Sequence, residues 1–150
     1  MSDNQIIIFD LDGTLALNKH REHFILGPNK DWDAFFLACG NDAPNIPIIE
    51  INRALFERYI IWIYSGRGEI ARAMTEAWLR QHGVVYNYLR MRAIDDHTPD
   101  EVLKREWLAE DCPDAVGAER VAMVFDDRDK VVKMWRDEGL TCLQVAPGDF

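Results

Sequence analysis

Two carboxylates stand directly after an apolar run near the start of the chain. Residues Ile6–Phe9 have the composition of a buried strand, and Asp10 and Asp12 follow it. In an extended chain, residues two apart point to the same side, so both carboxylates should face one way. A second pair, Asp126 and Asp127, follows another apolar run. If the two strands are neighbours, all four acidic side chains meet at one edge of a sheet.

Such a cluster needs protons or a cation. Two carboxylates about 4 Å apart repel by roughly 4 kcal/mol at an effective dielectric constant near 20. A single Asp at a strand end often only caps a turn, whereas four at two strand ends favour a metal site. Because no Cys or His is interleaved with these oxygen ligands, we predict Mg²⁺, with Asp10, Asp12, Asp126 and Asp127 as its ligands.

Gly13 and Thr14 complete the first motif. Glycine permits a backbone turn that other residues resist. Thr14 either bonds its own turn or places its backbone amide near a bound anion, and we count it among the candidate phosphate contacts.

The stretch "SGRGE", residues 65–69, has the features of an anion site. It follows the apolar run Tyr59–Tyr64 and precedes a predicted helix, whose free N–H groups and positive dipole end would suit phosphate. Ser65 offers a hydroxyl and Arg67 a forked cation for phosphate oxygens. We therefore predict phosphate contacts from Ser65, Gly66 and Arg67.

The predicted helix over 99–111 carries an ion pair on an unexpected face. Thr98 and Glu101 form a capping-box pattern at its start. At 100° per residue, Asp100 and Lys104 fall inside the apolar arc, where an ordinary surface pair does not belong. We predict that Lys104 reaches the phosphate site and that Asp100 orients it.

The whole chain alternates predicted strands and helices. Strands are expected at 6–9, 59–64, 86–92, 121–125 and 141–146, and helices at about 31–39, 47–58, 69–82, 99–111 and 130–138. This order predicts an α/β fold, a three-layer Rossmann-like parallel sheet covered on both faces, as one domain over residues 1–150. Ligands of such sheets gather beyond the carboxyl ends of the strands, where the polar clusters lie.

Composition limits the function classes. The 150 residues are 48% hydrophobic, which is typical of a folded domain with a sizeable core. A net charge of −9 argues against a long nucleic-acid footprint, although a pocket for one phosphate stays possible. No run of about 18 apolar residues predicts a membrane span. Three widely spaced cysteines and no signal-peptide pattern predict a reduced, cytoplasmic protein.

These motifs together resemble the haloacid dehalogenase superfamily of phosphotransferases. The resemblance rests on Asp-x-Asp-Gly-Thr, a Ser after the second strand, a Lys on a later helix and Asp-Asp after the fourth strand. It implies that Asp10 attacks phosphorus and that Asp12 is the general acid–base. It also implies a Mg²⁺ ion that neutralises charge between them.

A narrower likeness, to the 3′-phosphatase domains of phage polynucleotide kinase/phosphatases, runs nearly end to end. It rests on "DLDGTLALNKHR", "YSGRGE", "TPDEVLK" and "FDDRDKVVKMWRDEGLTCLQVAPGDF". It implies an enzyme that removes the 3′-phosphate from the end of DNA or RNA through an aspartyl-phosphate. The matched positions are the phosphate contacts Arg21, Ser65, Arg67 and Lys104, the required acid Asp100, the metal-binding Asp127, and Asp126 beside it as support or ligand.

The connection of about residues 16–46 is longer than a structureless loop should be. We predict a small lid that admits the end of a strand. Its aromatic residues either stack on a terminal base or form the lid's own small core, which is the favoured alternative; they are Phe24, Trp32, Phe35 and Phe36. His20 and His23 lack a third ligand, which disfavours zinc.

Two other functions stay open. A superfamily enzyme that acts on free nucleotides or other small phosphomonoesters would suit the negative charge. A signalling receiver domain also has an acidic Mg²⁺ pocket, but its paired acids come early and no Asp sits two residues past the acceptor. The related phage proteins carry a kinase domain with a P-loop, and this sequence holds no GxxxxGK[ST], so a kinase domain or partner chain would lie outside it.

Overall fold

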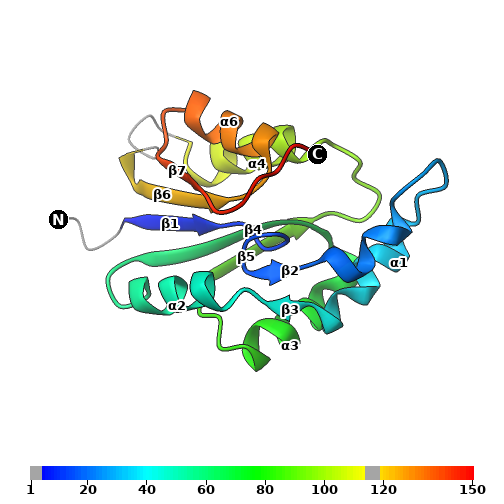
Figure 1. Ribbon diagram of the computed structural model, residues 1–150. Coiled ribbons are helices and arrows are strands. Elements are labelled where there is room, and N and C mark those ends of the chain that lie inside the picture. The colour runs from blue at the N-terminus through cyan, green and yellow to red at the C-terminus, as the bar shows by residue number, and fades with distance from the viewer. Residues whose placement is uncertain (1–4, 114–118) are drawn as a thin grey trace.

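The computed structural model describes residues 5–113 and 119–150 of the chain. Its centre is a five-stranded parallel sheet in the order β5-β4-β1-β6-β7 (Figure 1). The strands are β1 (Ile6–Phe9), β4 (Ile60–Gly68), β5 (Tyr88–Arg92), β6 (Val121–Asp126) and β7 (Cys142–Gln144). Phe9 pairs with Phe125 across β1 and β6, so the two strands that precede the acidic pairs are neighbours, as expected.

Helices cover both faces of this sheet. Ile6 and Ile8 pack in one apolar cluster with side chains of helices α4 (Asp100–Asp111) and α6 (Asp129–Asp137). Ile7 and Phe9 pack in another with side chains of helices α2 (Ile46–Leu55) and α3 (Arg72–Gln81). Figure 1 shows the two helix pairs on opposite sides of the strands. The predicted three-layer α/β class is confirmed.

The insert, defined here as residues 16–46, has structure of its own. It contains α1 and two 3₁₀ helices between the two short antiparallel strands of a ribbon: β2 (Ala16–Leu17), η1 (Lys19–Phe24), α1 (Trp32–Leu37), η2 (Ala38–Asn41) and β3 (Ala43–Pro44). Phe35 and Phe36 are buried with Cys39 and Ala71, which agrees with a small core inside the insert. Trp32 stays 42% exposed.

One predicted helix begins later than its pattern indicated. Residues 69–71 form a 3₁₀ turn, η3 (Glu69–Ala71), and α3 starts at Arg72. A 3₁₀ turn has 3.0 residues rather than 3.6, so it shifts the phase of the apolar stripe. Ile70 in this turn and Met74 near the start of α3 are exposed, while Trp78 is buried. Gly83 follows the helix with φ +68, the left-handed conformation in which glycine commonly ends a helix.

The capping box predicted at Thr98 and Glu101 is wrong. The cap position of α4 is Pro99, and no side chain caps it. The amide of Thr98 instead donates to Asp96 Oδ1 at 2.9 Å, which closes a turn before the helix.

Within the described residues, no helix is both long enough and apolar enough to cross a bilayer.

Candidate active site

The ends of β1 and β6 bring three carboxylates together. Oxygens of Asp10, Asp126 and Asp127 lie within 4.8 Å of one another, and all three residues are buried. The amide of Asp10 donates to the carbonyl of Phe125 at 2.9 Å, which ties the two strand ends together. Three of the four predicted acidic side chains therefore meet here, and the carboxylate of Asp12 is not among them.

Gly13 allows this close approach. Its φ is +84, and a Cβ built on it would lie 2.1 Å from Asp127 Oδ2. The residue is therefore required both by its left-handed backbone and by the carboxylate that fills the space of a side chain.

The electrostatics of the three acids suit a bound cation. Burial raises the pKa of Asp10 well above its usual range, the charge of Asp126 adds to this, and Lys104 offsets part of it. Burial likewise raises the pKa of Asp127 to about 6. Buried carboxylates that raise each other's pKa are stabilised by a hard cation, and an all-oxygen set fits Mg²⁺.

Lys104 reaches this cluster from α4. Its Nζ donates to Asp10 Oδ1 at 2.7 Å and to Asp126 Oδ2 at 3.0 Å, and its side chain is buried. Burial lowers the pKa of Lys104, but Asp10 and Asp126 outweigh it and leave the pKa above its ordinary value. The amine is therefore a fixed positive charge.

Asp100 does not hold Lys104, which corrects the predicted orienting role. Its carboxylate pairs with Arg92 of β5 and, at 3.2 Å, with Arg128 Nη1. A helical wheel gives the face on which Asp100 lies, but not which cations from other elements approach that face. Asp10 and Asp126 orient Lys104 instead.

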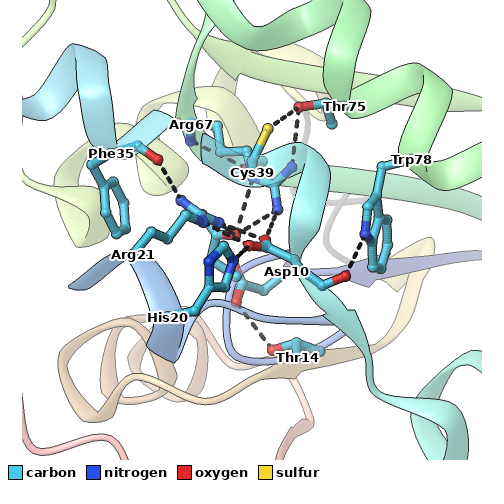
Figure 2. Close-up of polar contacts among 12 residues, drawn as sticks. Asp10, Thr14, His20, Arg21, Phe35, Cys39, Arg67, Thr75 and Trp78 are labelled. Atoms are coloured by element: carbon cyan, nitrogen blue, oxygen red, sulfur yellow. Dashed lines mark hydrogen bonds and ion pairs between the residues drawn. The ribbon is translucent and has the colours of Figure 1, made fainter. Parts of the chain in front are cut away.

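Asp12 faces two arginines rather than the metal-ligand cluster. Arg21 Nη2 donates to Asp12 Oδ1 at 2.5 Å, and Arg67 donates to the same oxygen from Nε at 3.0 Å and Nη2 at 2.7 Å. Figure 2 shows Arg21 and Arg67 with dashed lines for their polar contacts. Burial acts to raise the pKa of Asp12, but Arg67 and Arg21 outweigh it, and the pKa is lowered. The side chain is held as a carboxylate.

Asp42, which the sequence patterns did not single out, completes this group. It accepts from Arg21 Nε at 2.8 Å and Nη2 at 2.7 Å, and from Arg67 Nη2 at 2.8 Å. His20 Nε2 lies 2.7 Å from its Oδ1, so this histidine is engaged with a carboxylate. The signal that could have indicated a residue such as Asp42 is the pair Arg21 and Arg67. Two buried arginines beside the single carboxylate of Asp12 require a second anion. Among the described residues, the potential metal-ligating groups of three or more contain neither His20 nor His23.

The other predicted phosphate contacts differ in position. Thr14 is buried, donates its hydroxyl to Asp10 Oδ2 at 3.0 Å and bonds the carbonyl of Leu11 within its own turn. The hydroxyl of Ser65 accepts from the amide of Arg67 at 3.2 Å. Their contacts with a phosphate stay predictions.

The "SGRGE" stretch is not a helix N-terminus. Its first four residues continue β4 as far as Gly68, and a 3₁₀ turn follows. The strand therefore extends beyond its apolar part, with a register shift against β5 between Ser65 and Gly68. The prediction that a helix dipole at this stretch binds phosphate is therefore wrong. Arg67 extends from strand β4 to the carboxylates of Asp12 and Asp42.

A cavity of about 680 Å³ opens over these residues. Asp10, Asp12, Gly66 and Lys104 belong to its wall, whereas the side chains of Arg21 and Arg67 are buried behind Asp12. Two cations that the sequence patterns missed, Arg92 and Arg128, also form part of the wall. The site therefore presents both acidic and basic groups to this cavity.

Residues 4–150 match the family described as "Polynucleotide kinase PNKP phosphatase domain". A protein of Autographa californica nuclear polyhedrosis virus, named as a bifunctional polynucleotide kinase/RNA ligase, is 31% identical over 134 residues. That match covers 87% of this chain and 18% of the viral protein.

Solved structures show the same similarity. A chain in the "Structure of the Pnkp1/Rnl/Hen1 RNA repair complex" has a TM-score of 0.80 at 30% identity, covering 98% of this chain and 43% of that one. A haloacid dehalogenase-like hydrolase from Streptococcus pneumoniae has a TM-score of 0.63 at 15% identity, covering 96% and 85%. A haloacid dehalogenase family enzyme from Bacteroides thetaiotaomicron, in complex with magnesium and inorganic phosphate, has a TM-score of 0.58 at 11% identity, covering 97% and 96%. The last two show the fold alone.

Proposed function

Because this chain belongs to the family of polynucleotide kinase phosphatase domains, we propose that it removes the terminal 3′-phosphate from a DNA or RNA strand, with Mg²⁺ as its cofactor. The observation that carries the proposal is the shared cavity of Asp10 and Asp12. The Asp10 carboxylate lies beside Lys104 and two further acidic residues. The Asp12 carboxylate lies beside two arginines, Arg21 and Arg67.

The donor set supports a particular assignment of the metal ligands. Asp126 accepts three hydrogen bonds, from the amide of Asp127 at 2.9 Å, Lys104 at 3.0 Å and Trp135 Nε1 at 3.3 Å, whereas each oxygen of Asp10 accepts one, from Lys104 or Thr14. Asp10, Asp127 and the main-chain carbonyl of Asp12 would therefore hold Mg²⁺, with Asp126 in support. When bound, the ion would neutralise charge between the Asp10 carboxylate and a phosphoryl group.

Asp10 is the nucleophile of the proposed reaction. Its carboxylate oxygen bonds to phosphorus, the bond from phosphorus to the 3′-oxygen breaks, and Asp12 gives that oxygen a proton. Thr14 and Lys104 fix the attacking carboxylate by the bonds already described. Lys104 also meets the negative charge of the phosphoryl oxygens in the transition state. The product is a free 3′-hydroxyl and a phosphorylated Asp10.

Asp12 then reverses its role. It takes a proton from water, the water oxygen bonds to phosphorus, and the bond from Asp10 to phosphorus breaks to release inorganic phosphate. The arginines that lower the pKa of Asp12 suit this second, basic role. A phosphate that draws N–H donors of Arg21 or Arg67 away from Asp12 would raise its pKa and prepare the first, acidic role, which agrees with the phosphate contacts predicted for both arginines.

Family membership removes the receiver-domain alternative, since the chain is a phosphatase domain. A phosphatase of free nucleotides or other small phosphomonoesters is the remaining rival, and the net charge of −9 favours it. The viral relative combines a polynucleotide kinase with an RNA ligase in its name, and this chain spans a fifth or less of that protein. We propose that a kinase or ligase acts on the same strand ends, from another domain or chain. The cytoplasmic location stays a prediction.

Phosphate release from paired oligonucleotides tests the proposal. We expect Mg²⁺-dependent release from a strand with a 3′-phosphate, little from its twin with a 5′-phosphate, and none after chelation. Faster release from 3′-mononucleotides or sugar phosphates than from the oligonucleotide would favour the rival.

A further inference from the structure

The cavity wall contains two chemically different sets of residues. The acidic and basic groups described above form one set, the catalytic end. Apolar side chains form the other set, which we call the apolar end, and they come from the insert, from the turn before α3 and from the loop between β5 and α4; Leu26, Trp32, Ile70 and Ile94 are among them. The catalytic end and the apolar end belong to one continuous space.

The apolar end is unusually exposed. Ile94 at 72% and Leu26 at 68% are the most exposed large apolar side chains of the part of the chain that the structure describes, and both line this cavity. Trp32 and Ile70 are also exposed there. Concentrated exposed apolar surface beside a catalytic site marks a place for a ligand.

Trp32 supplies a flat surface in this region. It is the first residue of α1, and its ring lies 5.8 Å from Phe35 and 5.9 Å from Phe36 between ring centroids. Phe35 and Phe36 are buried in the core of the insert and fix the position of the indole, and Lys30 Nζ lies 5.9 Å from the centre of the indole ring. The exposed remainder of the ring is part of the cavity wall.

Apart from His97, the ionisable residues that the insert and the β5–α4 loop contribute to the cavity wall are acidic. Glu22 and Asp33 of the insert, and Asp95 and Asp96 of the β5–α4 loop, line the same wall. These carboxylates repel a phosphodiester chain but tolerate a neutral, flat group. A nucleobase is such a group, and it is joined through one sugar to the phosphate that would lie at Asp10.

We propose that the apolar end binds the terminal nucleobase of the 3′-phosphorylated strand, with Trp32 as the stacking surface and Leu26 and Ile94 packing beside it. This inference rests on the proposed function. The enzyme would then recognise the terminal nucleoside of the strand rather than a long stretch of its sugar–phosphate backbone. The inference is also compatible with the net charge of −9, because stacking needs no large basic surface.

Two substrates test the inference: an oligonucleotide ending in a normal 3′-phosphorylated nucleotide, and the same strand ending in a 3′-phosphorylated abasic sugar. We expect the wild type to prefer the first in kcat/KM, mainly through KM. Trp32→Ala should reduce that preference by roughly 5- to 150-fold, the range for loss of one base–aromatic stack. Trp32→Phe should retain most of it.

Ile94→Ala, in a loop rather than a helix, should reduce the preference without the risk of disturbing α1. Phe56→Ala is the matched control, since Phe56 is an exposed aromatic residue outside the cavity, and it should keep the wild-type preference. Equal use of the two substrates by the wild type, or an unchanged preference in both cavity variants, would overturn the inference and leave the 3′-phosphatase proposal standing. Release from neither strand, with hydrolysis of a small phosphomonoester such as glycerol 2-phosphate, would instead overturn the proposed function.

Discussion

At the residue scale, the site depends on two separate charge groups. Lys104 holds Asp10 and Asp126, while Asp42 holds Arg21 and Arg67 against Asp12. The two groups give adjacent carboxylates opposite properties, because the pKa of Asp10 is raised and that of Asp12 is lowered. A cation bound beside Asp10 would lower its pKa and favour the carboxylate that the proposed attack on phosphorus requires.

Replacing Asp42 tests the second group. Asp42→Asn leaves two buried guanidinium groups with one carboxylate, so we expect a loss of about 3 kcal/mol in the free energy of unfolding. In a domain of this size that corresponds to a fall in Tm of roughly 6–12 °C. Phosphatase turnover should also fall, because Asp12 loses the arginines that position it.

The control is Asp137→Asn, which removes an exposed partner of Lys133 within α6. Such surface pairs contribute little, so thermal unfolding of this variant should resemble the wild type. Matching Tm values for Asp42→Asn and the wild type would show that the arginines do not need Asp42.

Part of the candidate site could be predicted from the sequence, and part could not. The meeting of Asp10, Asp126 and Asp127 follows from their positions at the ends of two strands, and a helical wheel puts Lys104 on the buried face of its helix. Asp42 was missed because it lies in the insert, where short turns leave no periodic pattern to show which side chains are buried. Contacts between residues 21 and 25 positions apart, as from Asp42 to Arg21 and Arg67, leave no local signal.

At the element scale, two strand ends and one tight turn create the cluster. β1 and β6 end side by side, and the turn after β1 passes so close to Asp127 that only glycine fits at position 13. The apolar strands β1, β4 and β6 were readable from composition because each is buried on both faces. The polar continuation of β4 through Gly68 was not, since a Ser-Gly-Arg-Gly stretch before a helix has the sequence pattern of a turn.

The variants Gly13→Ala and Gly27→Ala distinguish the effect of backbone strain from the effect of a clash with Asp127. Both glycines have left-handed backbones, with φ +84 and +87, so each substitution should cost about 1–2 kcal/mol of stability. Only at Gly13 would the new Cβ meet Asp127, because nothing lies within 4 Å of the corresponding position at Gly27. Mg²⁺ titration by calorimetry should therefore show weakened binding for Gly13→Ala alone. Equal affinities in the two variants would contradict the placement of Asp127 as a ligand.

At the scale of the whole molecule, negative charge is concentrated where a cation is expected to bind. Without metal, the folded protein holds a proton on Asp127 up to about pH 6, whereas an unfolded chain releases it near pH 3.9. The folded state thus binds more protons in this interval, and the contribution of Asp127 to stability is lost as the pH rises through 6. Mg²⁺ would replace the proton.

Mg²⁺ should therefore stabilise the protein more at pH 7.5 than at pH 5. At a concentration 100 times its Kd, a ligand adds about 2.7 kcal/mol to the free energy of unfolding. Each pH unit below 6 should remove about 1.4 kcal/mol of this gain for each proton that the ion must displace. Thermal unfolding with and without Mg²⁺ at the two pH values measures the stabilisation by the ion at each pH. The variant Asp127→Asn should abolish the stabilisation, because it lacks a proposed metal ligand. An equal shift in Tm at both pH values would argue against carboxylate ligands.

The most direct test of the account is whether phosphate becomes bonded to Asp10. Wild-type protein should be mixed with an oligonucleotide that carries a radiolabelled 3′-phosphate, quenched in acid within the first turnover, and mapped by peptide. We predict hydroxylamine-sensitive label on the peptide that contains Asp10, and neither label nor turnover in Asp10→Asn. Release of phosphate at the full rate by Asp10→Asn, with no labelled protein at any time in the wild type, would contradict it.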